Sequence, residues 1–221
     1  MDKINVSCAG NSGCFSSGVT GIDVLKELSR EGIDDVLVAK VNGELMDLSA
    51  KIYTDSRIIP LGWEDEEGRE VLRHSAAHVM AQAVKELFPE VKLAIGPAIE
   101  DGFYYDFAVD KPFTPEDLDN ISSAMEKIIE RDLPFYRLEV PRDRARADFL
   151  DQGEKYKVEL IDDLPPDADI CLYQQGDFVD LCAGPHLPST GKVKAVKLLN
   201  LAGAYWRGDE KNPMLQRIYG T

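Results

Sequence analysis

Positive charge is scarce in this sequence. Its 221 residues include 25 Lys and Arg against 40 Asp and Glu, which gives a formal net charge of −15 at pH 7. An acidic chain repels a phosphate backbone at long range, so we do not expect strong non-specific binding of nucleic acid. Any contact with RNA must come from outside the chain or from two local basic segments, whose usual role is to form a solvated face. These segments contain Arg142, Arg144 and Arg146, and Lys192, Lys194 and Lys197.

Long apolar runs and a cysteine framework are also lacking. No run approaches the ~18 apolar residues that a membrane span needs, and residues 1–5 lack the basic and apolar regions of a signal peptide. Cys8, Cys14, Cys171 and Cys182 show no C-x-x-C spacing. Because free thiols are typical of a reducing compartment, we expect a cytoplasmic protein without membrane contact.

Residues 1–62 predict a small ubiquitin-like β-grasp domain. Asn42-Gly43 between two β-prone runs is a strong hairpin signal. A helix is expected to begin at Thr20 or Asp23 and to stop at Gly32. The other expected elements are strands at 4–9, 36–41, 44–48 and 57–61, and a loop-like stretch at 12–17.

Residues 63–221 predict an α+β domain in which a long helix packs on a mostly antiparallel sheet. The long helix is expected at 66–88, where apolar residues recur at helical spacing. Thr114 followed by Pro115 is typical of the start of a second helix. The remaining expected elements are a helix at 141–150, a hairpin around Asp101-Gly102, and strands at 92–100, 103–109, 156–161, 170–173, 178–182, 193–199 and 214–219.

The three histidines of the chain all lie in two short motifs. His74 and His78 form H-x-x-x-H, and Cys182 and His186 form C-x-x-x-H around Gly184-Pro185. Helical residues four apart share a face, with Cβ atoms ~5–6 Å apart, so the first pair can grip one ion or one substrate group. At about 100° per residue, these imidazoles lie away from the apolar stripe. The Gly-Pro turn can fold the thiol and the third ring towards one point.

Three chemistries fit these four side chains. One Cys with three His forms a tetrahedral zinc set, which becomes catalytic when water takes one position. Without a metal, the imidazoles bind substrate and one of them acts as general base. Cys182 as a covalent nucleophile would need a depressed thiol pKa and a paired base.

Further polar residues are candidates for the same site. Asp180, two residues before the thiol on an expected strand, could orient an imidazole or bind an amine. Lys157, on the expected strand at 156–161, could stabilise an oxyanion. The plain alternative for both is a solvated surface. Tyr104 and Tyr105 point to opposite faces of a strand, so we expect one in the core and one at a pocket. Gly96 either lets the backbone approach a ligand or forms a β-bulge.

A series of motifs in the second part of the chain resembles threonyl-tRNA synthetase. The resemblance runs in order from about residue 65 to the end, and residues 1–62 resemble the small TGS domain of that family. The motifs are RHSAAH at 73–78, AIGP at 94–97, GFYYD at 102–106, YKV at 156–158, CAGPH at 182–186, AGAYWRG at 202–208 and LQRIYGT at 215–221.

This resemblance implies hydrolytic editing. The amino-acid pocket of an aminoacylation site rejects a substrate that lacks one methyl group by only ~1–3 kcal/mol. A threonine enzyme therefore needs a second site that cleaves Ser-tRNA(Thr). It implies that residues 63–221 are an editing domain, an aminoacyl-tRNA ester hydrolase. Six residues fall on the family's editing-site positions: His74, His78, Lys157, Asp180, Cys182 and His186.

The resemblance also suggests roles within this set. His74 or His186 would polarise the attacking water, and Lys157 would stabilise the oxyanion or the 3′ ribose. Asp180 would hold the seryl amine or orient a histidine, while His78 and Cys182 would exclude the methyl group of threonine. Related alanyl-tRNA editing domains bind zinc with a similar set, whereas bacterial threonyl enzymes are thought to edit without a metal. Zinc therefore stays open, with no cofactor required.

The family's aminoacylation core, with its ATP and zinc sites, would lie beyond Thr221. We therefore expect no threonine activation, and either a fragment cut at a domain boundary or a free-standing editing factor. The expected partner is tRNA(Thr) mischarged with serine, bound weakly and with strong salt sensitivity. A monomer is expected because the family's dimer contacts belong largely to the core.

Three alternatives remain at this stage. The first is a free-standing zinc-dependent deacylase of the alanyl-editing type. The second is a non-catalytic module that binds tRNA or another partner. The third is a structural zinc domain, which would unfold in the presence of chelators.

Overall fold

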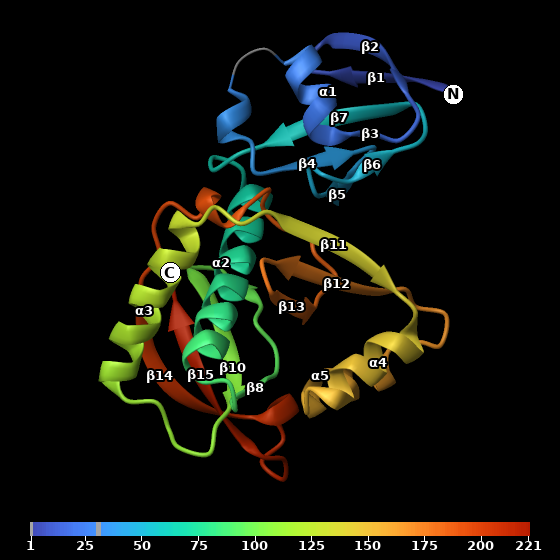
Figure 1. Ribbon diagram of the computed structural model, residues 1–221. Helices are drawn as coiled ribbons and strands as arrows, with labels where there is room; N and C mark the ends of the chain where they lie inside the picture. Colours follow the sequence, from blue (N-terminus) through green and yellow to red (C-terminus); the bar gives the residue numbers. More distant parts are fainter. Residues whose placement is uncertain (1, 30–31) are drawn as a thin grey trace.

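The computed structural model describes residues 2–29 and 32–221. Figure 1 shows an N-terminal module, here β1 to β7 with α1, beside a larger part that runs from α2 to β15. Helices pack on mixed and antiparallel sheets, so the predicted α+β class is confirmed. Within the described ranges, every helix is too short or too polar to cross a membrane.

The N-terminal module is a twisted sheet with one helix across it. Its main sheet has the order β2–β1–β7–β4–β5, with β1 and β7 paired in parallel between two antiparallel hairpins. Val24 and Leu25 of α1 pack on Ile4 and Ile58 of the sheet, which agrees with the predicted β-grasp arrangement. The elements are β1 (Lys3–Cys8), β2 (Asn11–Ser16), β3 (Val19–Thr20), α1 (Gly21–Leu28), the 3-10 turn η1 (Ile33–Asp35), β4 (Val38–Val41), β5 (Glu44–Met46), β6 (Lys51–Ile52) and β7 (Ser56–Leu61).

Two local predictions for this module need correction. Residues 12–17 were predicted as loop-like, but β2 pairs with β1 along its whole length through a turn in which Ala9 and Gly10 have positive φ. The backbone ladder outweighs the low strand propensity of Ser and Gly. Thr20 does cap the helix, but α1 ends at Leu28. The rest of the predicted helix, towards Gly32, includes residues 30–31, which lie outside the described residues.

The larger part contains two antiparallel sheets. One has the order β14–β15–β10–β8, with β9 also paired to β10, and the other has the order β11–β12–β13. The elements are α2 (Glu66–Leu87), β8 (Lys92–Leu93), β9 (Ala98–Ile99), β10 (Gly102–Ala108), α3 (Pro115–Glu130), β11 (Phe135–Val140), α4 (Arg142–Asp151), α5 (Lys155–Asp163), β12 (Ile170–Gln175), β13 (Phe178–Leu181), the 3-10 turn η2 (Thr190–Lys192), β14 (Leu198–Tyr205), the 3-10 turn η3 (Trp206–Gly208) and β15 (Met214–Gly220).

Helix α2 is the central element of the larger part. It runs past the sheet of β10 and β15 on one side and the sheet of β12 and β13 on the other (Figure 1). Residues 75–84 are all buried, so the core contacts of the helix extend well beyond the predicted apolar stripe and include His78. Both sides of the helix are covered because a separate sheet lies against each.

Three predicted strands are also corrected. Residues 156–161 belong to helix α5, because the buried residues Glu154, Lys157, Val158 and Ile161 follow helical spacing. The alternation seen in the sequence came from treating Lys157 as exposed. Residues 92–100 split into β8 and β9, since Pro97 cannot donate to a ladder. Residues 193–199 do not form one strand, because the backbone near residue 193 closes the turn η2 and β14 begins only at Leu198.

Candidate active site

Helix α2 and the turn after β13 bring the two sequence motifs together. His74 Nε2 lies 3.0 Å from Cys182 Sγ, although these residues are 108 positions apart in the sequence. Cys182 Sγ lies 3.3 Å from His186 Nε2. The His78 and His186 ring centroids are 4.2 Å apart, and those of His74 and His78 are 5.0 Å apart. We call these four side chains, His74, His78, Cys182 and His186, the His–Cys cluster.

The His–Cys cluster is half-buried to fully buried, and this burial favours its uncharged forms at neutral pH. His78 and His186 are 3% and 0% exposed, whereas His74 is half-buried. Burial lowers the pKa of His78 and of His186 well below the usual value of 6.5, and it also lowers the pKa of His74. Burial raises the pKa of Cys182 to about 12. A protonated thiol is a poor nucleophile, so burial of the Cys182 side chain argues against covalent catalysis by this residue.

Hydrogen bonds assign donors and acceptors to three members of the cluster, His74, Cys182 and His186. His74 Nδ1 donates to the Gly96 carbonyl at 3.3 Å, which leaves Nε2 to accept from the Cys182 thiol. Ser75 Oγ accepts from Leu187 N at 3.1 Å and lies 3.0 Å from His186 Nδ1, so we assign its proton to that nitrogen. His186 Nε2 then donates to Cys182 Sγ. The chain of donors runs from Ser75 through the thiol to Gly96.

Lys157 and Asp180 form a buried ion pair near the His–Cys cluster. Lys157 Nζ lies 2.7 Å from Asp180 Oδ1 and donates to the Tyr105 hydroxyl at 2.9 Å. That hydroxyl donates to Asp180 Oδ2 at 2.6 Å. Asp180 accepts its hydrogen bonds from Tyr105 and from the backbone of Leu181, not from an imidazole. Both charges nevertheless act on the pKa of His74, which Asp180 raises and Lys157 lowers.

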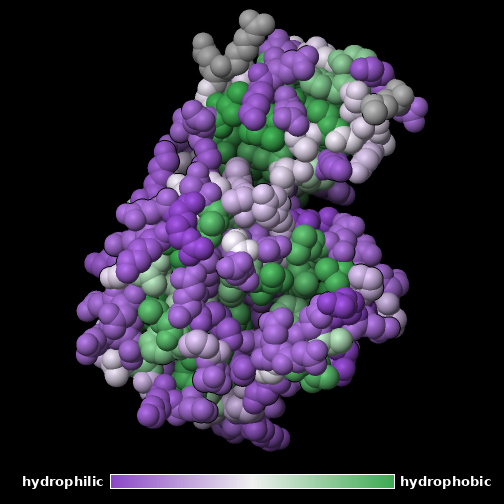
Figure 2. Space-filling view, viewed as in Figure 1, coloured by the Kyte–Doolittle hydropathy of each residue, from purple (hydrophilic) through white to green (hydrophobic). Residues whose placement is uncertain are grey.

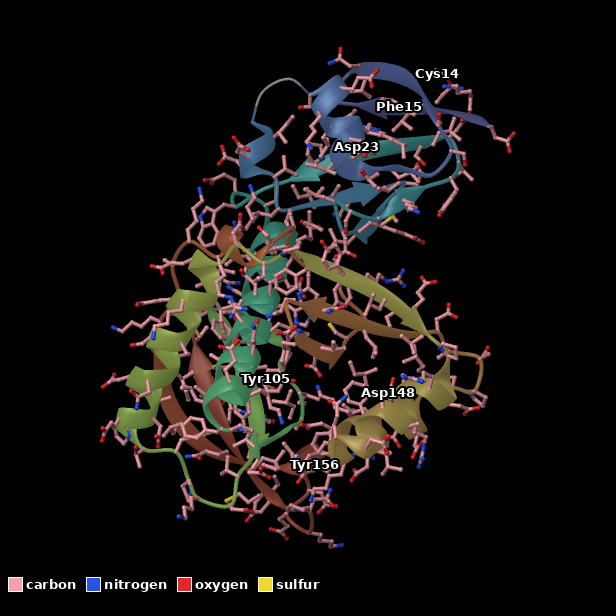
Figure 3. All side chains as sticks on the ribbon, viewed as in Figure 1. Cys14, Phe15, Asp23, Tyr105, Asp148 and Tyr156 are labelled. Carbon is pink, nitrogen blue, oxygen red and sulfur yellow. The ribbon has the colours of Figure 1, made fainter. Side chains whose placement is uncertain are left out.

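The two tyrosines of β10 (Tyr105 is labelled in Figure 3) lie on opposite faces of their strand, as predicted. Tyr105 is buried beside Lys157. Tyr104 stacks on the guanidinium of Arg217, 3.6 Å from its ring centroid, so the structure does not place it with the His–Cys cluster. A Cβ on Gly96 would lie 2.1 Å from the Tyr105 ring, so this position needs glycine.

A pocket of 360 Å³ opens beside His74. Pro97, Gly184 and Leu45, the last from the N-terminal module, also line it. A larger pocket of 630 Å³ lies between Trp63 and Lys194 and contains no histidine or cysteine. We therefore take the smaller pocket as the approach to the His–Cys cluster.

The His–Cys cluster fits a zinc ion by its donor set. One potential ligand atom from each residue lies within 4.8 Å of the others, and tetrahedral zinc holds such atoms about 3.3–3.8 Å apart. His78 Nδ1 is buried without a hydrogen-bond partner among the described residues. Gly96 and Ser75 hold the Nδ1 atoms of His74 and His186, as outer partners of metal-bound histidines do.

Comparisons with known proteins show which family the chain is similar to. The family model "Threonyl and Alanyl tRNA synthetase second additional domain" matches residues 170–219, which include Asp180, Cys182 and His186. The threonine–tRNA ligases of Desulforamulus reducens and Carboxydothermus hydrogenoformans are each 56% identical over 207 residues, or 94% of this chain. That of Clostridium tetani is 56% identical over 204 residues.

The chain resembles the N-terminal part of threonyl-tRNA synthetases. It spans about a third of the length of these curated relatives, 33%, 33% and 32% in turn. The predicted resemblance to threonyl-tRNA synthetase is thereby confirmed over nearly the whole chain.

Sequence patterns missed two residues that support the His–Cys cluster. Ser75 lies inside the H-x-x-x-H motif, where a hydroxyl in a run of alanines was the available signal. Asp47 accepts a hydrogen bond from His186 N at 2.7 Å. It belongs to the N-terminal module, and no motif links it to the turn.

Proposed function

We propose that this chain is an aminoacyl-tRNA ester hydrolase that removes serine from mischarged Ser-tRNA(Thr). In this proposal, residues 63–221 are the editing domain and residues 1–62 a TGS-like domain. One observation carries it: His74, His78, Cys182 and His186 converge beside a pocket that His74 lines. The similarity to threonyl-tRNA synthetases supplies the substrate class.

His74 is the proposed general base. It is the histidine that lines the pocket, and burial keeps its imidazole neutral at pH 7. A water that replaces the Cys182 thiol at His74 Nε2 can give up its proton there as it attacks the ester carbonyl. The Gly96 carbonyl, which accepts from Nδ1, then stabilises the imidazolium that forms. The imidazolium returns this proton to the ribose oxygen of the tRNA as the ester C–O bond breaks, which releases free serine and regenerates neutral His74.

Lys157 is the proposed partner of the developing negative charge. An ammonium has three donors, and Asp180 and Tyr105 take two of them. The third remains for the oxyanion or for the 3′ ribose of the tRNA. Asp180 holds Lys157 in place, so we propose that Asp180 acts on the substrate through the lysine.

The side chains around His74 are proposed to distinguish serine from threonine. One methyl group changes binding by about 1–3 kcal/mol, and a second sieve uses that difference again. The side chains of His78 and Cys182 lie behind His74, where the additional methyl group of threonine would clash. Thr-tRNA(Thr) is therefore expected to resist hydrolysis.

The test is release of serine from Ser-tRNA(Thr). His74→Ala should slow single-turnover hydrolysis by about 10²–10⁴-fold, and the double variant His74→Ala/Lys157→Ala should show no measurable hydrolysis. Lys155→Ala, an exposed lysine of the same helix α5, is the matched control and should hydrolyse normally. Circular dichroism and urea unfolding check that each variant folds. Full hydrolysis by the folded double variant would refute the proposal.

A zinc-dependent deacylase is the second candidate, and the unpartnered His78 Nδ1 favours it. His74, His78, Cys182 and His186 would hold the ion, which would supply a Lewis acid for water or for the ester carbonyl. Metal analysis of protein purified without added zinc, with hydrolysis measured before and after a chelator, separates the candidates. About one equivalent of zinc and loss of activity on chelation support the metal version; metal-free, active protein rejects it.

A further inference from the structure

Asp47 follows β5 in the N-terminal module, yet its carboxylate contacts the turn of the larger part that carries His186. Its Oδ1 accepts a hydrogen bond from the His186 backbone N–H at 2.7 Å, and its Oδ2 accepts one from the Tyr173 hydroxyl at 2.7 Å. Asp47 is 9% exposed. The first bond joins residues that are 139 positions apart in the sequence, and the second joins residues that are 126 positions apart. One side chain therefore links the N-terminal module to the His–Cys cluster.

The two bonds fix the turn from both sides. The Tyr173 ring lies 4.4 Å from the His186 ring, centroid to centroid. The backbone of the turn rests on the Tyr173 hydroxyl, because a Cβ on Gly184 would lie 2.0 Å from that oxygen. Asp47 therefore holds the backbone of His186 and also the ring that supports it. A shift of this turn would change the 3.3 Å separation of His186 Nε2 and Cys182 Sγ.

Attachment of the N-terminal module to the larger part would not by itself require a buried carboxylate. Elsewhere the N-terminal module and the larger part meet through the apolar side chains of Leu37, Val38 and Leu61 and through polar pairs nearer the surface, such as Lys192 with the Asp34 carbonyl. Burial of a carboxylate costs several kcal/mol unless its oxygens are bonded. Both donors to Asp47 come from the structure that surrounds the His–Cys cluster. Leu45, two residues earlier, lines the pocket.

We propose that Asp47 is a positioning residue of the hydrolytic site, and that the N-terminal module is thereby part of the catalytic machinery. The inference rests on the proposed hydrolysis of Ser-tRNA(Thr). Asp47 acts on the reaction through the turn that it holds and not through the substrate. It holds the His186 turn so that the donors of the His–Cys cluster stay aligned with the pocket.

The test compares Asp47→Ala and Asp47→Asn in the full chain. Misplacement of catalytic groups by about 1 Å costs up to ~10²-fold in rate, so kcat of Asp47→Ala should fall by about 10- to 100-fold, with KM unchanged. Asp47→Asn keeps an acceptor for the His186 N–H and should recover much of kcat. The His186 backbone amide resonance should move upfield in Asp47→Ala, which loses the bond, and stay in place in Asp47→Asn.

Tyr173→Phe and Lys192→Ala complete the design. Tyr173→Phe removes one of the two bonds, and its effect should not add to that of Asp47→Ala, because both act on one turn. If Asp47→Ala fails to fold, Asp47→Asn and Tyr173→Phe still decide the question. Lys192→Ala removes a contact between the two parts away from the turn and should leave kcat unchanged.

The outcomes separate the inference from the function on which it rests. No hydrolysis by the unaltered chain would overturn the proposed function together with this inference. An active chain in which folded Asp47→Ala keeps its kcat overturns the inference alone. An equal loss in Lys192→Ala also overturns it, because the effect would then belong to the contact between the two parts in general.

Discussion

Gly184 and Gly208 have similar backbone conformations but different surroundings. Their φ angles are +74° and +70°. A Cβ on Gly184 would lie 2.0 Å from the Tyr173 hydroxyl oxygen, whereas a Cβ on Gly208 would meet nothing within 4 Å. The pair therefore separates backbone strain from a clash at the candidate site.

We predict that Gly184→Ala is the more damaging of the two substitutions. Gly208→Ala should lower the free energy of unfolding by about 1 kcal/mol through the positive φ alone. Gly184→Ala should lower it by a further ~1–3 kcal/mol from overpacking, and should also slow Ser-tRNA(Thr) hydrolysis. Urea unfolding and deacylation assays measure both effects. Equal values for the two variants would contradict the proposed packing of the turn on Tyr173.

The buried imidazoles predict a loss of stability in acid. Burial holds the pKa of His78 and of His186 well below 6.5, while an unfolded histidine titrates near 6.5. Below about pH 6.5 the unfolded chain binds protons that the folded chain does not, so the free energy of unfolding falls as pH falls. Each imidazole contributes at most about 1.4 kcal/mol per pH unit, and the contribution is fully restored above pH 6.5.

Urea unfolding at pH 7.5, 6.0 and 5.0 in the presence of a chelator measures this dependence. His78→Gln lacks one of the imidazoles whose pKa burial lowers and should lose less stability than the unaltered chain over the same range. The comparison matters because carboxylates also titrate towards pH 5. Parallel curves for the two proteins would show that His78 is not held neutral in the folded state.

At the residue scale, sequence spacing predicted the four members of the His–Cys cluster but not all of the residues that contact them. Both motifs place two side chains four residues apart, a spacing that a helix or a Gly-Pro turn brings to one side. This local geometry made it possible to predict His74, His78, Cys182 and His186 from the sequence. Asp47 could not be found in this way, because its contacts depend on how two parts of the chain pack. The interpretation of Asp180 as a partner of an imidazole was not supported, because Lys157 and Tyr105 take its oxygens.

At the scale of elements, one ion pair joins helix α5 to strand β13. Lys157 and Asp180 are 2% and 1% exposed. Removal of one partner leaves an uncompensated buried charge, so Asp180→Ala should cost about 3–5 kcal/mol of unfolding free energy. Lys157→Met/Asp180→Leu removes both charges and should be closer in stability to the unaltered chain, while it loses hydrolysis. Chemical unfolding of the three proteins tests this; a double variant less stable than Asp180→Ala would contradict it.

Sequence signals predicted helix and strand boundaries well where the contacts involved join residues that are close in the sequence. The Thr114 and Asp117 side chains form a capping box at the start of α3, and Asn42-Gly43 turns between β4 and β5, both as expected. Helix α5 was misread because Lys157 is buried. Its charge is balanced by Asp180 from another element, and a periodicity argument that assigns lysine to solvent cannot anticipate that partner.

At the scale of the whole molecule, the division into residues 1–62 and 63–221 stays a prediction. A separate hydrophobic cluster within the N-terminal module favours it. Leu37, Val38 and Leu61, however, pack into the core around α2, and Asp47 reaches the His186 turn. If Asp47 acts as we propose, the two parts form one functional unit whatever their folding independence.

The two basic segments offer few free positive charges to a tRNA. Hydrophilic residues cover most of the face of the larger part seen in Figure 2. In the first basic segment, Arg142 donates to two carbonyls, Arg144 pairs with Asp148, and Arg146 pairs with Asp162. In the second, Lys192 donates to the Asp34 carbonyl. Lys194 and Lys197 are exposed and remain for phosphate.

This distribution predicts how the 221-residue chain binds tRNA(Thr). With a net charge of −15, and with Lys194 and Lys197 as the free cations of the two basic segments, binding at 150 mM salt should be weaker than about 1 μM, and it should weaken further as salt rises because each phosphate contact releases counterions. Lys194→Glu/Lys197→Glu should reduce the affinity and flatten its salt dependence. Arg144→Glu, at an arginine already paired with Asp148, should change both far less. Fluorescence anisotropy over a KCl series measures these values. A nanomolar Kd at 150 mM KCl would mean that contacts other than these lysines hold the RNA.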